Sequence, residues 1–544
     1  MNARQTPPID SQAVQRLRDR LRLRPDDGRA WLELARNLSR GAPGQELFHA
    51  IEQSIRSLPE NDEVWSLAAA VQERIRGPEA ARQWLEHTAE QNPGLAAPQF
   101  ALARLESARN PEKAVDRYRG ILAKFPTDTR AKSQLEDLQI RLGDAHREAG
   151  HWRTALAAYR EVESARAHDP AVMNNIGCCL MGLESPDEAE GYFARALALD
   201  PRLVQARLNA GLIHAYRGDN AAAISAIEQI LEKPDLHSAL RKSARTLVDI
   251  MTEQQRLAPV ISRSLESGCV DELQSALESA PERLLQPDPA FMEKLGSLAG
   301  QLRELSPVPE LPPRCEEAAA LPLIEALALC KVEWRVEEFG ALAERLADPE
   351  NRFAPDSREH AVRIAWKACL DRRDQDVTQL QGAAGEAWLR YWHARLLGMT
   401  PDKHPGQFKA VANTAQDLTL TPPEFVPGTV RSTLADLRPT LPDGACSAAF
   451  QFLSLIAIHG FSDGNGRIAQ FVLNWEAERA GLPTFVIDQD MRQPISRSKD
   501  QAWLHGDFGP LFTDLARTAV RTEQFLEQLR GIPVPPDFST KFPL

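Results

Sequence analysis

Proline residues recur at a nearly constant interval through the first part of the chain, and this spacing restricts the fold more than any other feature. The intervals are 34, 34, 33, 44, 31 and 33 residues, between Pro25, Pro59, Pro93, Pro126, Pro170, Pro201 and Pro234. A period of that length, with alanine-rich segments between the prolines, is typical of stacked helical hairpins. Each hairpin buries its apolar face against its neighbours, so the spacing predicts a helical array rather than one globular core.

Residues at fixed distances from these prolines resemble those of the tetratricopeptide repeat (TPR). Trp31 and Trp65 each follow a repeat proline by six residues, and Gly211 follows Pro201 by ten. The resemblance implies about six helix hairpins over residues 12–240, stacked into a right-handed superhelix. Such arrays present a concave groove to a protein or peptide, so we expect recruitment of a partner; a purely structural spacer fits the same pattern.

The period is lost after residue 240, although the sequence stays helical in character. A proline-dense stretch at residues 305–313 cannot continue a helix and is typical of a linker. We therefore predict a helical connector with a proline-rich linker at residues 241–314. A second domain follows at 315–544, with its core at 386–530.

A short polar loop at residues 459–467 separates two apolar segments with helical spacing, and its composition suits a phosphate site. Gly464 and Gly466 are expected to turn the backbone with positive φ and to let it approach a ligand. The N–H groups that open the following helix attract an anion. Arg467 can fork onto phosphate oxygens, and Asn465 can bond to them without adding charge.

Two further residues of the loop have the chemistry of a transfer reaction. His459 ends the first helix, and its ordinary pKa near neutrality lets it accept a proton from an attacking hydroxyl. Asp463 is a hard oxygen ligand, suited to the Mg²⁺ that accompanies nucleotide phosphates. These parts together predict phosphoryl or nucleotidyl transfer, where catalysis is mostly positioning and charge neutralisation.

The loop resembles the signature of the Fic family, HxFx(D/E)GNGRxx(R), and further landmarks of that family match at residues 404–409 and 506–511. The resemblance implies an all-α fold, a TPR-type solenoid followed by a helical Fic-type domain with a small β-hairpin flap near residues 413–427. It also implies a protein adenylyltransferase that moves AMP from ATP to a target hydroxyl. In that scheme His459 is the base, Asp463 holds Mg²⁺, and Gly464, Asn465, Gly466 and Arg467 bind phosphates.

The chain departs from the family pattern at two auxiliary positions. Lys409 stands where the family has an arginine, and Gln470 replaces the second arginine of the signature, which usually contacts the outer phosphates of ATP. The family's inhibitory motif, (S/T)xxxE(G/N), is also missing, which is consistent with that loss. We therefore keep two alternatives: transfer of UMP, phosphate or phosphocholine from another donor, or a weakly catalytic TPR adaptor whose Fic-like module binds nucleotide.

Composition sets the remaining expectations. A net charge of −12 argues against a nucleic-acid partner, and the longest apolar run, residues 452–458, is too short to span a membrane. The seven cysteines are scattered and the N-terminus has no signal pattern, so we expect a cytoplasmic protein. The expected partner is a target protein held by the TPR groove and the Fic flap. Association into a homo-oligomer is left open.

Overall fold

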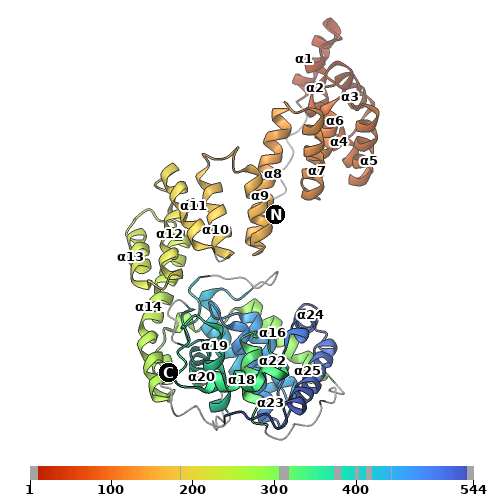
Figure 1. Ribbon diagram of the computed structural model, residues 1–544. Coiled ribbons are helices and arrows are strands. Elements are labelled where there is room, and N and C mark those ends of the chain that lie inside the picture. The colour runs from red at the N-terminus through yellow and green to blue at the C-terminus, as the bar shows by residue number, and fades with distance from the viewer. Residues whose placement is uncertain are drawn as a thin grey trace. The chain divides into compact units, whose positions relative to one another are not determined.

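The computed structural model describes residues 10–183, 185–305, 311, 318–372, 381–398, 403–411, 420–442 and 444–535. Within these ranges every regular element is a helix, and an isolated β-bridge joins Phe408 to Phe461. The all-α class predicted from the sequence is confirmed. The chain divides into two compact units, Met1–Ile176 and Gly177–Leu544, which are described separately (Figure 1). No helix in the described part of the chain is both long and apolar enough to cross a bilayer.

The first unit consists of successive helical hairpins, as the proline spacing predicts. Its helices are α1 Ser11–Leu23, α2 Gly28–Leu38, α3 Gln45–Ser57, α4 Asp62–Arg76, α5 Pro78–Gln91, α6 Ala96–Glu106, α7 Pro111–Lys124, α8 Thr129–Glu148, α9 Trp152–Val162 and the first half of α10 Pro170–Gly182. The repeated residues have repeated roles. The Trp31 indole N–H donates to the Pro25 carbonyl at 2.7 Å, and that of Trp65 donates to Pro59 at 2.8 Å. Each bond ties a helix to the turn before it, which explains the fixed six-residue spacing.

The second unit begins inside the predicted repeat array. Its helices are the rest of α10, then α11 Pro186–Leu199, α12 Val204–Tyr216, α13 Asn220–Leu231, α14 Ser238–Ser267, α15 Asp271–Glu278, α16 Pro289–Glu304, α17 Leu321–Leu329, α18 Val336–Ala347, α19 Arg358–Arg372, α20 Gly382–Leu397, α21 Val426–Ser432, α22 Ala445–Ile458, α23 Asn465–Arg479, α24 Gln489–His505 and α25 Gly509–Gln528. The repeats therefore run past the divide between the units, and the last ones belong to the C-terminal body.

Polar and apolar contacts join these last repeats to the C-terminal helices. The Asn220 amide donates to the Gln254 side-chain oxygen at 2.8 Å, and the Gln254 amide donates to the Phe408 carbonyl at 2.7 Å. Both side chains are buried. Ile227 of α13 and Met251 of α14 share one apolar cluster with Ala410. This junction fixes α12–α14 against the segment that leads into the candidate site.

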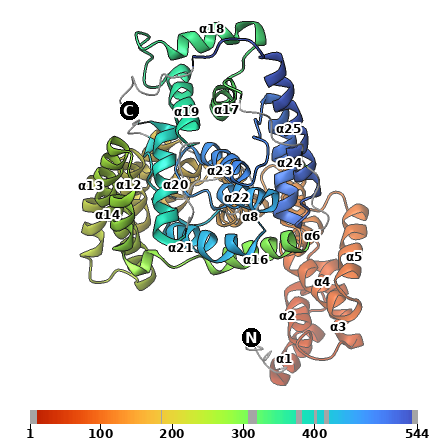
Figure 2. The same cartoon turned by 90° about the horizontal axis from the view of Figure 1, so that it is seen from below.

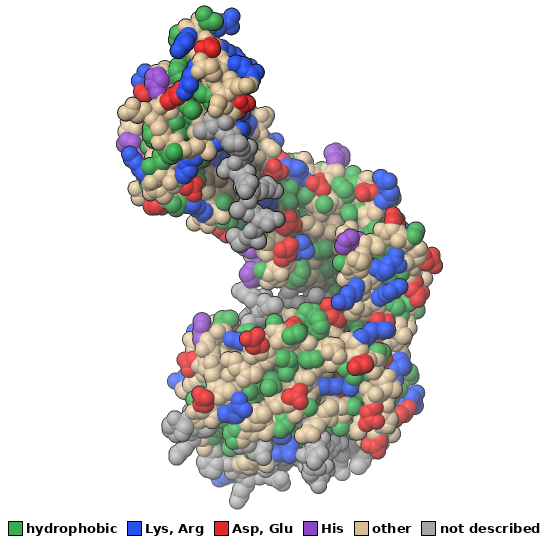
Figure 3. Space-filling view, turned by 180° about the vertical axis from the view of Figure 1, so that it is seen from behind, with side chains coloured by type: hydrophobic (Ala, Val, Ile, Leu, Met, Phe, Trp, Pro, Cys, Tyr) green, Lys and Arg blue, Asp and Glu red, His purple; other side chains and the backbone are tan. Residues whose placement is uncertain are grey.

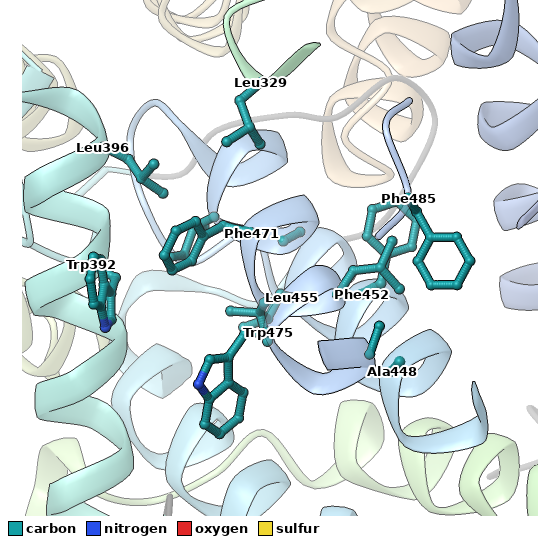
Figure 4. Close-up of a cluster of buried hydrophobic side chains, with 14 of the residues drawn as sticks. Leu329, Trp392, Leu396, Ala448, Phe452, Leu455, Phe471, Trp475 and Phe485 are labelled. Atoms are coloured by element: carbon teal, nitrogen blue, oxygen red, sulfur yellow. The ribbon is translucent and has the colours of Figure 1, made fainter. Parts of the chain in front are cut away.

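Helix α22 lies at the centre of the C-terminal body and is buried over nearly its whole length. Figure 2 shows α22 and α23 surrounded by α16, α20, α21, α24 and α25. Aromatic residues fill the spaces between them: Trp392 of α20 packs on Phe471 of α23 with ring centroids 5.0 Å apart (Figure 4). The apolar sequence before the polar loop therefore forms the core helix that the loop terminates.

Two expected segments fall wholly or largely outside the described residues. Of the predicted proline-rich linker, only 305 and 311 are described. Of the expected β-hairpin flap, residues 413–419 lie outside them, and the rest is coil, a short 3₁₀ turn at Pro423–Phe425 and the first residues of α21.

Candidate active site

The loop between α22 and α23 has a backbone that glycine and one strained histidine make possible. His459 ends α22 in the left-handed conformation, with φ 50°, and Gly464 precedes α23 with φ 75°. A Cβ on Gly464 would lie 3.0 Å from the His393 ring and from Leu397, so this position requires glycine. Our expectation of positive φ at Gly466 is wrong, because this residue lies in the first turn of α23. A Cβ there would meet nothing within 4 Å, so Gly466 leaves open space at the helix N-terminus.

The Asn465 side chain holds the loop closed. Its oxygen accepts the Phe461 N–H at 2.9 Å, and its NH₂ group donates to the Phe461 carbonyl at 2.7 Å. Both residues are buried. The observed role of this side chain is therefore to fix the loop, and direct phosphate binding by it stays a prediction. Phe461 anchors the loop in the core, where its side chain is fully buried.

His393 of α20 supports the same loop through both nitrogens of its ring. Its Nε2 lies 2.9 Å from the Asp463 carbonyl, and its Nδ1 accepts the Gly406 N–H at 3.0 Å. Because Nδ1 is an acceptor, Nε2 must carry the proton and donate. The ring stacks on Phe461 with centroids 3.6 Å apart, and burial lowers the pKa of His393 to about 4. The two hydrogen bonds and the stacking together position the loop.

His459 is held in a form that can accept a proton. Its Nδ1 lies 3.3 Å from the Ile456 carbonyl, so Nδ1 carries the hydrogen and Nε2 is left with a lone pair. Burial, assisted by the positive charge of Lys409, lowers the pKa of His459 to about 4. Burial also lowers the pKa of Lys409 to about 7, and the backbone N–H of Lys409 donates to the Gly460 carbonyl at 2.8 Å. Because its pKa is about 4, the His459 imidazole is neutral at physiological pH.

The loop opens into a cleft of about 1030 Å³ whose lining residues all belong to the second unit. The lining brings together the candidate site residues of the loop and its helix: His459, Asp463, Gly464, Asn465, Gly466, Arg467 and Gln470. It does not include Lys409, which is buried. Among the described residues, the charged lining side chains are six basic ones and two acidic ones: Arg217, Lys331, Lys403, Arg467, Arg492 and Lys499 against Asp187 and Asp463. In a protein of net charge −12, this excess marks the cleft as an anion site.

The Asp463 carboxylate fits the single protein ligand of a phosphate-bound Mg²⁺. Its side chain is 52% exposed; Oδ1 accepts the Gly464 N–H at 2.6 Å, and Oδ2 lies 3.6 Å from the Lys403 ammonium. Among the described residues there is no cluster of three His, Cys, Asp or Glu side chains that could hold a metal. Mg²⁺ bound through one carboxylate and substrate phosphates needs no such cluster.

Several cations of the cleft were not predicted from the sequence. Three of them are lysines that lie more than 70 residues from one another in the sequence: Lys331, Lys403 and Lys499. No motif links any of them to the loop. Gln470 lies on α23 one turn beyond Arg467 and lines the cleft. It is 8% exposed, and its amide lies 3.5 Å from the Phe485 carbonyl. The neutral side chain thus lines the cleft while other elements supply positive charge.

Comparisons with known proteins agree with these two architectures. Residues 384–477 match the Fic/DOC family, and residues 140–203 and 175–239 match the tetratricopeptide repeat. The chain therefore carries a Fic domain preceded by TPR repeats.

Individual relatives are similar only over the domain. A protein adenylyltransferase Fic of Nematostella vectensis is 29% identical over 133 residues, which is 24% of this chain and 31% of the relative. The protein adenylyltransferase fic-1 of Caenorhabditis briggsae is 29% identical over 132 residues, 23% of this chain and 25% of the relative. The matched part thus spans less than a third of either relative. A structure of Fic-1 from C. elegans is 19% identical and covers 63% of this chain and 92% of that one, with a TM-score of 0.30.

Proposed function

We propose that this protein is a protein adenylyltransferase that moves AMP from ATP to a hydroxyl group of a target protein. One observation carries the proposal. A neutral histidine, His459, the open N-terminus of α23, and Arg467, whose side chain has no partner among the described residues, meet in one cationic cleft. The similarity of the domain to proteins named adenylyltransferases supports it.

His459 is the proposed base. Its Nε2 has a free lone pair because Nδ1–H donates to the Ile456 carbonyl. A pKa of about 4 makes a weak base in the free protein. An anionic donor beside the ring would raise that pKa toward neutrality, which is the range in which a base is most effective.

The proposed donor lies with its phosphates at the start of α23. The first N–H groups of this helix and the space at Gly466 accept phosphate oxygens, and Arg467 supplies a two-pronged cation. Asp463 would hold Mg²⁺, which neutralises developing charge on the leaving phosphates. Asn465 and His393 keep this loop in place.

The transfer balances as an in-line displacement. The acceptor oxygen forms a bond to the α phosphorus of ATP while the bond from that phosphorus to the bridging oxygen breaks. The hydroxyl proton passes to Nε2 of His459, and pyrophosphate leaves with the electrons of the broken bond. The product is a phosphodiester between AMP and the target side chain.

The proposed target is recruited by the repeats. TPR arrays bind proteins or peptides, and in this chain the last repeats also reach the chemistry: Asp187, Tyr216 and Arg217 line the cleft that contains His459. Target selection would therefore occur at the cleft wall as well as in the groove.

A second candidate is the same transfer from another donor. It is favoured by the neutral Gln470, which leaves less positive charge on α23 than the family signature provides. UMP, phosphate and phosphocholine transfer all use the same base and leave different groups on the protein.

The test is incubation of the full-length protein and cell lysate with each nucleotide labelled at the α phosphorus, followed by mass spectrometry of labelled proteins. We expect AMP on Ser, Thr or Tyr side chains with wild type, and a loss of about 10²–10⁴ in rate for His459→Ala. His505→Ala is the control, because His505 is exposed and lies outside the cleft lining. Equal labelling by wild type and His459→Ala contradicts the proposal, and so does nucleotide binding without any transfer, which is the adaptor outcome.

A further inference from the structure

Three cations of the cleft lack a partner within the described chain. Lys331 follows α17, Arg467 lies in the first turn of α23, and Arg492 lies in the first turn of α24; none forms a hydrogen bond or ion pair through its side chain with a described residue. The other basic lining residues are paired, among them Lys403 with Asp463 and Lys499 with Asp500. Unpaired cations that converge on one cleft are placed to bind an anion.

Lys331 has a positive φ, a backbone conformation that is unfavourable for a residue with a side chain. Three non-glycine residues of the described chain have positive φ: Lys331 at 54°, His404 at 48° and His459 at 50°. All three line this cleft. Lys331 caps the C-terminus of α17, where its N–H donates to Ala328 and the next N–H donates to Leu327. Glycine is the favoured residue at such a cap. A lysine that adopts this strained conformation indicates a functional role for its positively charged side chain.

Lys331 and Arg492 line the same cleft as Gln470, the neutral residue on α23. The neighbour of Lys331, Cys330, lies close enough to Arg467 for that charge to oppose the burial that raises the pKa of Cys330 to about 11. Arg492 lines the cleft together with Gln470 and also borders an adjacent cavity of about 150 Å³. Both cations come from outside residues 384–477, the segment that matches the Fic family.

We propose that Lys331 and Arg492 bind the outer phosphates of a nucleoside triphosphate, in place of a cation at position 470. This inference rests on the proposed function, in which the phosphate beside His459 is held by Arg467 and the start of α23. The phosphates beyond it then need cations from other elements. Lys331 and Arg492 are the cleft cations on other elements that have no partner among the described residues. The donor is consequently recognised by the length of its phosphate chain.

The experiment is calorimetry of the full-length protein with ATP, ADP and AMP. We expect Lys331→Ala and Arg492→Ala each to weaken ATP binding about tenfold to a hundredfold, the value of a charged hydrogen bond, and to leave AMP binding nearly unchanged. The matched controls are Arg335→Ala and Arg497→Ala. Both arginines are exposed, close in sequence to the tested residues and absent from the cleft lining, so ATP binding should stay as in wild type.

A further variant separates lost charge from a damaged fold. Lys331→Gly removes the same charge but relieves the positive-φ strain, so its thermal midpoint should equal or exceed that of wild type while ATP binding weakens as in Lys331→Ala. The inference is overturned if both alanine variants bind ATP as wild type does, or if they lose affinity equally for ATP and AMP. Transfer assayed in parallel keeps the two proposals apart. His459-dependent transfer with unchanged ATP binding in the variants rejects only this inference, whereas phosphate-selective binding without transfer rejects only the adenylyltransferase.

Discussion

At the scale of residues, the site contains a buried histidine, His393, and a partly buried one, His459, fixed in opposite tautomers. His459 keeps its hydrogen on Nδ1, facing the Ile456 carbonyl, and offers Nε2 to the cleft. His393 accepts a backbone N–H on Nδ1 and donates from Nε2 to the Asp463 carbonyl. One histidine is thereby available for proton transfer, while both nitrogens of the other are used to position the loop.

The low pKa of His459 predicts an unusual pH profile. Because the free protein holds this pKa at about 4, kcat/KM should fall on the acid side near pH 4, and not near the ordinary value of about 6.5. Lys409→Met removes a positive charge that lowers this pKa, so the acid limb should move to higher pH. Initial rates across pH 3.5–8 at about tenth-saturating ATP measure both shifts. A wild-type limb at about 6.5, unchanged in the variant, contradicts the assigned environment.

His393→Phe tests the positioning histidine. Phenylalanine can keep the stacking on Phe461, but it leaves the Gly406 N–H and the Asp463 carbonyl without partners, so unfolding should require about 1–3 kcal/mol less for each orphaned group.

The pH dependence of stability provides the control for that variant. Below pH 6.5 the unfolded chain binds a proton that folded His393, with a pKa of about 4, does not bind. Wild-type stability should therefore decrease as the pH falls from 6.5 to 4, and the slope should shrink in His393→Phe. Urea denaturation at several pH values measures both effects. An unchanged slope contradicts burial of a neutral imidazole.

At the scale of elements, the α22–loop–α23 unit was predictable because its information is local. The apolar run of α22, the glycine at position 464 and the polar loop adjoin in sequence, and so do the prolines and tryptophans of each repeat. Two roles were not predictable in the same way. The Asn465 side chain turns back onto Phe461. The cleft also receives cations from α24 and from the residues that follow α12 and α17, and no local pattern connects these to the loop.

Two of the loop glycines, Gly464 and Gly466, provide a matched pair of substitutions. Gly464→Ala forces positive φ on alanine and places its Cβ against His393 and Leu397, so it should destabilise the protein by about 1–3 kcal/mol. Gly466→Ala meets no neighbour and favours the helix, so stability should rise by up to about 1 kcal/mol. If donor phosphates occupy the space at Gly466, the second variant should nevertheless bind ATP more weakly. Thermal unfolding and calorimetry of both variants decide, and equal destabilisation contradicts the described loop.

At the scale of the whole molecule, positive charge is concentrated in the cleft although the chain is acidic. On the face seen in Figure 3, basic and acidic side chains are interspersed over the coloured surface. The described part of the cleft lining instead has six basic and two acidic residues, in a chain whose net charge is −12. The last repeats form part of this lining, so the division of the chain into repeats and Fic domain does not coincide with its division into compact units.

Two truncations test that division. Removal of residues 1–176 leaves the second compact unit intact and should give a folded protein. Removal of residues 1–240 takes away α12 and α13 and exposes the apolar residues Met251 and Ala410, so this shorter protein should unfold at lower temperature. Circular dichroism melts compare the two, and indistinguishable midpoints contradict the structural role of the last repeats.

The central claim is that the cleft brings the α phosphorus of ATP to an acceptor hydroxyl beside His459. The most direct measurement uses the purified protein and the target protein identified by mass spectrometry. The two are incubated with ATP that carries radiolabel at the α phosphorus in one reaction and at the γ phosphorus in another. We predict α label on the protein, γ label only in released pyrophosphate, and loss of both in His459→Ala. Label from the γ position on the protein, or α label that is retained in His459→Ala, would contradict the account.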